Sequence, residues 1–320
     1  MAINADKPHL WKADTRASVD QFNKWFLKFA PRAYRETRAA TVESVKKGLA
    51  LTDDLAAITP EILRAHPDIL PTLRMSMCPP LARDRLTGLS DSTKNLVGSL
   101  EEGKVPPRMS QESLGEHLGR IAAIFLRMRD VDIFPWIAEH RLPTEEERYR
   151  SSTIVADRLC GAVADPIVRN AQEKRQLALI AEYLTRRGYK KQAHPNGIPL
   201  LQMESGTFSF RMNVLVKPSK TDEATVKIPV DVVIQPTHAK LPHLPLFIET
   251  KSAGDFTNVN KRRKEEATKI NQLKLTFGDE VVYALFLCGY FDAAYLGYEA
   301  AEGIDWIWEH RIEDLDKLGI

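Results

Sequence analysis

The sequence predicts an α/β protein with a helical N-terminal part, and two features of the chain lead to that class. Apolar residues recur at helical spacing through the first 150 residues or so. After about residue 200, short apolar runs follow one another, and a charged helix separates the last two. A crossover helix between two buried strands implies a parallel pair, which is typical of α/β domains. We therefore expect an all-helical domain over residues 1–150 and an α/β domain over residues 151–320.

The first domain is recognised by its helix signals. Ser18 is a suitable N-cap for a helix that Pro31 should kink or restart. The apolar face of this helix consists of Val19, Phe22, Trp25, Phe26 and Phe29. Thr59 followed by Pro60 indicates a second helix start. The segment 113–129 has the apolar spacing of an amphipathic helix, and an acidic helix start is expected at 143–147.

The second domain begins with helices and continues with strands. Segment 153–189 reads as two helices, the second of which ends at Gly188. Runs at 206–216, 224–234 and 245–251 have the composition of strands, and 258–277 is a charged helix. The run 281–288 (VVYALFLC) is typical of a fully buried strand.

Composition excludes several classes of protein. The chain has 320 residues, with 45 basic and 43 acidic side chains, a net charge of +2 and 43% hydrophobic residues. These values are ordinary for a soluble globular protein and exclude a disordered, collagen-like or disulfide-stapled chain. They do not indicate a strongly basic nucleic-acid binder. The three cysteines are isolated, and no apolar run has the length of a membrane span, so we expect a cytoplasmic protein.

Asp231, Glu249 and Lys251 form the most informative pattern, because each stands in an otherwise apolar strand. Asp231 lies within a run of valine and isoleucine. Glu249 and Lys251 end the strand 245–251, and residues i and i+2 of a strand point to the same side. The pattern thus places two carboxylates and an ammonium where an apolar core disfavours them.

Two carboxylates directed at one point repel each other unless a divalent cation lies between them. Magnesium prefers hard oxygen ligands and takes only one or two carboxylates from the protein. Lys251 cannot bind a metal, but its ammonium can hold an attacking water and stabilise charge on a phosphate. We interpret Asp231 and Glu249 as Mg²⁺ ligands, and both of them together with Lys251 as catalytic residues for phosphodiester hydrolysis.

The competing interpretation is a salt-bridged Glu249–Lys251 pair on a solvated strand face, with Asp231 at a strand end. The pattern D…ExK alone occurs by chance in many chains of this length. Its strand context, the preceding proline and the following helix favour the catalytic interpretation. Glu182, on the helix before the first strand, is a candidate auxiliary acid, and an ordinary exposed glutamate is the alternative.

A basic segment follows the strand that ends in Lys251. Four positive charges fall within one helical turn, at Lys261, Arg262, Arg263 and Lys264. Beside a metal-binding carboxylate pair, these side chains are candidates for binding DNA phosphates. Ser252, Asn258 and Asn260 could add phosphate or base-edge contacts. A solvated helix face with i,i+4 ion pairs is the alternative.

Arg83 and Arg85 are the DNA-binding candidates of the N-terminal half. They flank Asp84 at the expected start of a short helix. An arginine held by a neighbouring aspartate can present its guanidinium to guanine. A surface charge cluster is the alternative.

The segments PVD (229–231) and ETK (249–251) resemble the motif of the PD-(D/E)xK nuclease superfamily, as do the strand order and the intervening helix. More narrowly, the chain resembles the XamI-type type II restriction endonucleases. This likeness covers most of the chain and is clearest at PPLARDRL, TIVADRLCGAVADPIVRNAQEKRQLALI, IPVDVVIQP, KSAGDFTNVNKRRKEEATK and FLCGYFDAAYLGYEAAEGIDWIWEHRI.

The resemblance implies a restriction-endonuclease-like core, in which helices flank a central mixed β-sheet. It also implies Mg²⁺-dependent cleavage of double-stranded DNA at a short palindromic site, with Asp231 and Glu249 as metal ligands and Lys251 orienting the water. A palindromic target favours a homodimer. A companion DNA methyltransferase would protect the host genome. The helical domain 1–150 would grip DNA or support dimerisation.

Other functions remain open at this point. A repair or recombination nuclease would read DNA structure rather than sequence, and the superfamily motif is common to both kinds of enzyme. A non-catalytic DNA-binding protein on the same fold is a different class, but the intact Asp231, Glu249 and Lys251 argue against it. A structural interaction protein would leave the carboxylate pair unexplained.

Overall fold

The chain divides into two compact units. The computed structural model describes residues 2–161, 164–193, 200–219, 224–240, 242–254 and 259–320. Met1–Pro31 and Val168–Ile320 form one unit, called the sheet unit, and Arg32–Ile167 form the helical unit. The chain passes between the units inside two helices, α1 (Pro8–Leu51) and α9 (Ala164–Arg186). The division differs from the expected boundary at residue 150, chiefly because the N-terminal segment belongs with the sheet.

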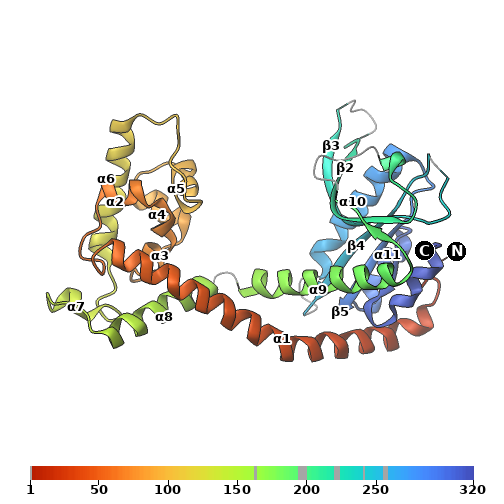
Figure 1. Cartoon of the computed structure of the whole chain (residues 1–320), viewed down its shortest axis with the longest axis horizontal. Coiled ribbons are helices and arrows are strands. Elements are labelled where there is room, and N and C mark those ends of the chain that lie inside the picture. Colours follow the sequence, from red (N-terminus) through yellow and green to blue (C-terminus); the bar gives the residue numbers. More distant parts are fainter. Residues whose placement is uncertain (1, 162–163, 194–199, 220–223, 241, 255–258) are drawn as a thin grey trace. The chain divides into compact units, whose positions relative to one another are not determined.

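The helical unit is a bundle of short helices around one apolar core (Figure 1). The core combines residues of α1, such as Val45 and Leu49, with residues of α6, such as Leu118 and Phe125. The elements are the last part of α1, α2 (Pro60–Ala65), η1 (Pro67–Ile69), α3 (Leu70–Met75), α4 (Arg83–Leu89), α5 (Lys94–Glu101), α6 (Gln111–Met128), α7 (Pro135–Ala138) and α8 (Glu145–Gly161). The helix start at Thr59 and Pro60 is confirmed, because the Thr59 side chain caps α2.

The sheet unit is built on one six-stranded mixed sheet. The strands are β1 (Lys190–Lys191), β2 (Thr207–Val216), β3 (Val226–Gln235), β4 (Leu246–Ala253), β5 (Tyr283–Gly289) and β6 (Asp305–Trp308). They lie in sequence order; β2, β3 and β4 are antiparallel neighbours, whereas β4, β5 and β6 run parallel. The predicted α/β class, with a mixed sheet between helices, is confirmed.

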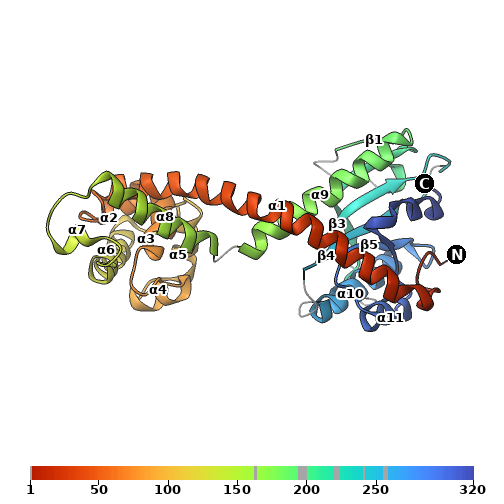
Figure 2. The same cartoon turned by 90° about the horizontal axis from the view of Figure 1, so that it is seen from below.

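Helices cover both faces of the sheet (Figure 2). One face packs against α9 and η3 (Glu309–Leu318), with Ile180, Ile248 and Phe286 in its core. The other face packs against α10 (Val259–Phe277) and α11 (Ala293–Ala301), with Leu273 and Leu285 in its core. The helix α10 connects the parallel strands β4 and β5, as the crossover in the sequence indicates. A short 3-10 turn, η2 (Leu200–Gln202), precedes β2.

The first helix differs from its prediction in two respects. It begins at Pro8 instead of after Ser18, and it continues through Pro31. A proline removes one helical hydrogen bond, and packing in the two units holds this helix on either side of that position. Ser18 is therefore not an N-cap: its hydroxyl is buried and accepts a hydrogen bond from the backbone N–H of Gly289 at 2.8 Å.

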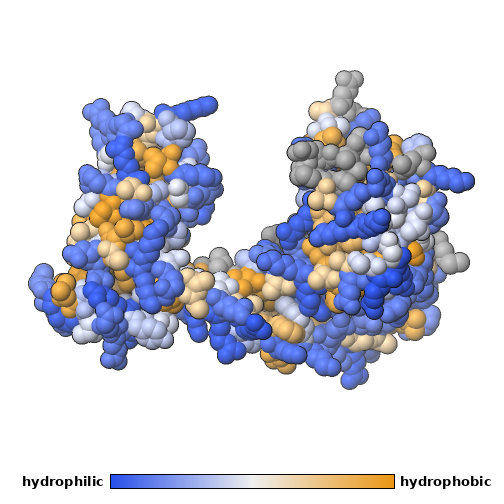
Figure 3. All heavy atoms as spheres, viewed as in Figure 1, coloured by the Kyte–Doolittle hydropathy of each residue, from blue (hydrophilic) through white to orange (hydrophobic). Residues whose placement is uncertain are grey.

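Only part of the predicted apolar face of α1 is buried. Phe22 and Trp25 pack in the sheet unit, whereas Phe26 and Phe29 are 40% and 42% exposed. The face shown in Figure 3 is mostly hydrophilic, with smaller hydrophobic patches between the hydrophilic residues. In the described residues, no helix is long and apolar enough to cross a membrane.

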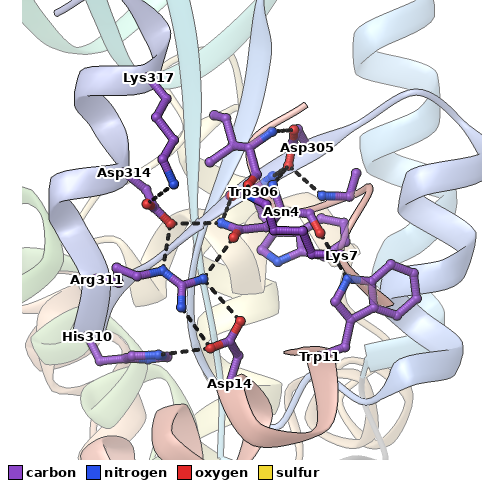
Figure 4. Close-up of polar contacts among 12 residues, drawn as sticks. Asn4, Lys7, Trp11, Asp14, Asp305, Trp306, His310, Arg311, Asp314 and Lys317 are labelled. Atoms are coloured by element: carbon purple, nitrogen blue, oxygen red, sulfur yellow. Dashed lines mark hydrogen bonds and ion pairs between the residues drawn. The ribbon is translucent and has the colours of Figure 1, made fainter. Parts of the chain in front are cut away.

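A polar network fixes the N-terminal segment to the end of the sheet (Figure 4). The Asp305 carboxylate accepts hydrogen bonds from three backbone N–H groups, those of Ile3, of Asn4 at 2.9 Å and of Ala5 at 3.1 Å. The Arg311 guanidinium donates to Asn4 at 2.8 Å, and it also pairs with Asp14 and Asp314. This network explains why the first helix starts early and belongs to the sheet unit.

Candidate active site

The candidate site lies where the neighbouring strands β3 and β4 stop pairing. Their last paired residues at this end are Val232 and Ile248. One step further along the same register, Asp231 and Glu249 would face each other. A sheet that loses its hydrogen bonds between two central strands leaves backbone groups and side chains that need other partners. The structure thus brings the two predicted carboxylates together at the point where the strands part.

The Asp231 carboxylate binds the neighbouring strand directly. Its Oδ2 atom accepts hydrogen bonds from the backbone N–H of Thr250 at 2.8 Å and from the Thr250 hydroxyl at 2.9 Å. Two donors on a single oxygen fix the orientation of the carboxylate. Thr250 was not among the predicted site residues. It lies between Glu249 and Lys251 on β4, where its backbone N–H and its hydroxyl both reach Asp231.

Glu249 is a buried carboxylate held by two lysines. Its side chain is only 9% exposed, and its Oε1 atom lies 3.5 Å from Lys251 Nζ and 2.7 Å from Lys269 Nζ. Burial raises the pKa of this carboxyl group above its ordinary value, the two lysine charges oppose that rise, and the Asp231 charge adds to it. Its second oxygen, Oε2, is buried and has no hydrogen-bond partner among the described residues.

Lys251 lies between two carboxylates and is 16% exposed. Its Nζ atom is 3.0 Å from Oε1 of Glu266, closer than the 3.5 Å to Glu249. Burial by itself would lower the pKa of the Lys251 ammonium, but the attraction of Glu249 and Glu266 outweighs burial and raises it. The ammonium therefore stays charged. Glu249 is buried and Lys251 is half-buried, so this ion pair does not lie on a solvated strand face as the alternative expected.

The helix α10 contributes two residues that the sequence did not single out. Glu266 is fully buried against Lys251, and Lys269 is paired with Glu249. Their positions share one helix face with Ile270 and Leu273, which pack on the sheet. This spacing is the signal that could have found them, because residues three and four apart lie on the same side of a helix.

The structure describes only some of the predicted DNA-binding residues around α10. Asn258 lies outside the described residues, and the side chains of Asn260, Lys261, Arg262 and Arg263 also lie outside what is described. Lys264 is exposed on α10, and Ser252 is half-buried on β4 next to Lys251. Their roles in binding DNA stay predictions.

Three other predicted residues lie elsewhere. Glu182 is on α9, is 67% exposed, and forms an ion pair with Arg186 at 4.0 Å. That arrangement matches the ordinary exposed glutamate that was the alternative. Arg83 and Arg85 are exposed on α4 of the helical unit. Arg83 Nε donates to Glu101 at 2.6 Å, so its described acidic partner is Glu101 instead of Asp84.

The arrangement of Asp231 and Glu249 fits a divalent cation. Glu249 has an oxygen with no described hydrogen-bond donor, and the neighbouring Asp231 adds negative charge that a cation would offset. Within the described residues, no cluster of three or more histidine, cysteine, aspartate or glutamate side chains could hold a metal. Magnesium does not need such a cluster, since it binds through one or two carboxylates and keeps several waters.

Comparison with known proteins identifies the family. The family model described as XamI restriction endonuclease matches residues 53–308, most of the chain. The chain belongs to the XamI restriction endonuclease family. It is 55% identical over 317 residues to the type II restriction enzyme SalI from Streptomyces albus G, and the alignment covers 99% of both chains. No solved structure matches.

The XamI family match confirms the resemblance seen in the sequence. The matched range includes β3, β4, α10 and β5, the elements of this XamI-family chain that hold the candidate site. It also includes most of the helical unit, so the family likeness is not limited to the nuclease motif. The catalytic roles of Asp231, Glu249 and Lys251 stay predictions.

Proposed function

We propose that the protein is a type II site-specific endodeoxyribonuclease, which hydrolyses phosphodiester bonds of double-stranded DNA at a short palindromic sequence with Mg²⁺. The observation that carries the proposal is the group formed by buried Glu249 and half-buried Asp231 and Lys251, where β3 and β4 stop pairing. Full-length similarity to a type II restriction enzyme supports the same reaction.

In this proposal, Asp231 and Glu249 hold the cation, and Lys251 acts on the water and the phosphate. A bound divalent cation supplies Lewis-acid polarisation of the phosphate and compensates the two carboxylates. The Lys251 ammonium can hold and orient the attacking water and stabilise charge on the phosphate. Thr250 keeps Asp231 in place through two hydrogen bonds. Its two ion pairs hold the Lys251 side chain in position, so the ammonium is already oriented before DNA binds.

The partners of the reaction follow from its substrate. A palindromic site presents the same sequence on both strands, so a homodimer with two-fold symmetry can cut both. The helical unit, with Arg83 and Arg85 exposed, is then a candidate for gripping DNA or for dimer contacts. A DNA methyltransferase of matching specificity would protect the genome in the cytoplasm where the enzyme acts.

Plasmid digestion tests the proposed function. The purified protein with Mg²⁺ should cut plasmid DNA into discrete fragments, and EDTA should prevent the cutting. Replacing Mg²⁺ with Ca²⁺ should permit binding without cleavage. A smear would favour a nuclease that reads DNA structure, and intact plasmid under all Mg²⁺ concentrations would contradict the proposal.

Replacing Glu266 with glutamine should slow DNA cleavage by about 10–100-fold, because Glu266 orients Lys251 in the way that an outer hydrogen-bond partner orients a group at a metal site. The amide keeps the size of the buried side chain but loses the charge that attracts Lys251 at 3.0 Å. Single-turnover cleavage measures the rate, and DNA binding in Ca²⁺ should change little. Glu265→Gln is the matched control, since Glu265 is exposed on the same helix. Equal rates for both variants would show that Glu266 does not support Lys251.

A further inference from the structure

Lys269 occupies an unusual position for a lysine of a charged surface helix. Its side chain is only 17% exposed, and its Nζ atom lies 2.7 Å from Glu249 Oε1. The same ammonium donates to the carbonyl oxygen of Pro229 at 2.8 Å, on the strand that contains Asp231. It thus contacts one proposed metal ligand directly and lies beside the strand of the other.

Among the residues that the structure describes, the charges of the site do not balance. Among the described residues, Asp231, Glu249 and Glu266 contribute three carboxylates, whereas Lys251 and Lys269 contribute two ammonium groups. Lys251 is shared between Glu249 and Glu266. Of the two described ion pairs of Glu249, the one with Lys269 is shorter, at 2.7 Å against 3.5 Å. Because this contact is partly buried, salt and water screen it less than they would screen a surface ion pair.

An ammonium and a divalent cation compete for the same carboxylate oxygens. Both are positive, so their mutual repulsion disfavours close binding of both to Glu249. A lysine ammonium sits on a flexible four-carbon stem and can move away from its partner. Lys251 is held by a second carboxylate, Glu266, whereas the described partners of Lys269 are Glu249 and one carbonyl group.

We propose that Lys269 is the resident counter-ion of Glu249, that a divalent cation replaces it there, and that the freed ammonium then binds a DNA phosphate. The inference rests on the proposed function, because it takes Glu249 as a metal ligand. A cation of charge +2 would change the excess charge of the group from one negative to one positive. A phosphodiester carries one negative charge, so DNA and cation would bind more tightly together than either does alone.

Binding of Mn²⁺ to the DNA-free protein tests the first part, with free Mn²⁺ measured by electron paramagnetic resonance. Lys269→Gln should tighten Mn²⁺ binding by about tenfold or more, because it removes a positive charge in contact with Glu249. Lys269→Arg keeps the charge and should stay close to the wild type. Lys274→Gln, the control, removes the same charge from the same helix, about 7.5 Å further along its axis, and should change the affinity by less than about twofold.

Binding of plasmid-derived duplex DNA in Ca²⁺ tests the second part. Lys269→Gln should weaken it by about a few-fold, because one phosphate contact is lost, while Lys274→Gln leaves it unchanged. Should the glutamine variant not fold, Lys269→Met makes the same comparison. Unchanged or weaker Mn²⁺ binding in both variants, or equal tightening by Lys274→Gln, would overturn the counter-ion role. Unchanged DNA binding would overturn the phosphate role. Neither measurement involves cleavage, so a failure of the proposed function appears separately, as intact plasmid with Mg²⁺.

Discussion

Replacing Lys251 with alanine is expected to lower DNA cleavage by about a hundredfold to a thousandfold. The variant loses the ammonium that lies 3.0 Å from Glu266 and 3.5 Å from Glu249, and with it the group proposed to hold the attacking water. Single-turnover digestion of a plasmid with Mg²⁺ measures the rate. DNA binding in Ca²⁺ should remain within a few-fold of the wild type, because one phosphate contact among many is lost.

A control variant tests whether the loss of cleavage is specific to Lys251. Lys104→Ala removes an exposed lysine of the helical unit, which pairs with Glu102 at 3.1 Å, and should leave cleavage unchanged. Cleavage by Lys251→Ala at a rate near that of the wild type would contradict the site assignment. Loss of DNA binding together with cleavage would instead assign Lys251 to substrate binding.

The variant Gly289→Ala is expected to destabilise the sheet unit by about 3 kcal/mol or more. Gly289 ends β5 with a φ of +107°, a conformation that side chains other than glycine rarely adopt. A Cβ atom there would overlap the carbonyl oxygen of Ala253, at the end of β4. Urea unfolding followed by tryptophan fluorescence measures the loss, since Trp306 and Trp308 are buried in the sheet unit.

The control for this variant is Gly297→Ala, which lies inside α11 of the same unit. Its new Cβ would make an ordinary contact with Trp11 at 3.7 Å. Alanine is favoured over glycine in a helix by about 1 kcal/mol, so this variant should be neutral or more stable than the wild type. Equal free energies of unfolding for the two alanine variants would contradict the backbone argument at Gly289.

The sequence located the strands around the site well, because their signals are local. The predicted runs 206–216, 224–234, 245–251 and 281–288 correspond to β2, β3, β4 and β5. The strands β1 and β6 have two and four residues, too short for a period to be recognised. The prediction of Ser18 as an N-cap was wrong because it rested only on the preference of serine for that position. The partner of its hydroxyl in the structure is the backbone N–H of Gly289, which is distant in the sequence.

The candidate site shows the same division between local and distant information. The spacing of Glu249 and Lys251 on one strand is local, and so is the position of Asp231 in an apolar run. The contacts of Glu266 and Lys269 depend on how α10 lies against β4, which a charged helix sequence does not specify. The one sequence signal for their burial is that Glu266 and Lys269 share a helix face with the apolar residues Ile270 and Leu273, which pack on the sheet.

The division of the sheet unit between two chain segments has a consequence for biosynthesis. Residues 32–167 form a contiguous unit, so they can fold while the ribosome is still translating the rest. The sheet unit needs both Met1–Pro31 and Val168–Ile320, and the contact between Ser18 and Gly289 closes only near the end of translation. Asp231 and Glu249 are thus assembled late, and an incomplete chain whose helical unit can already fold still lacks the candidate site.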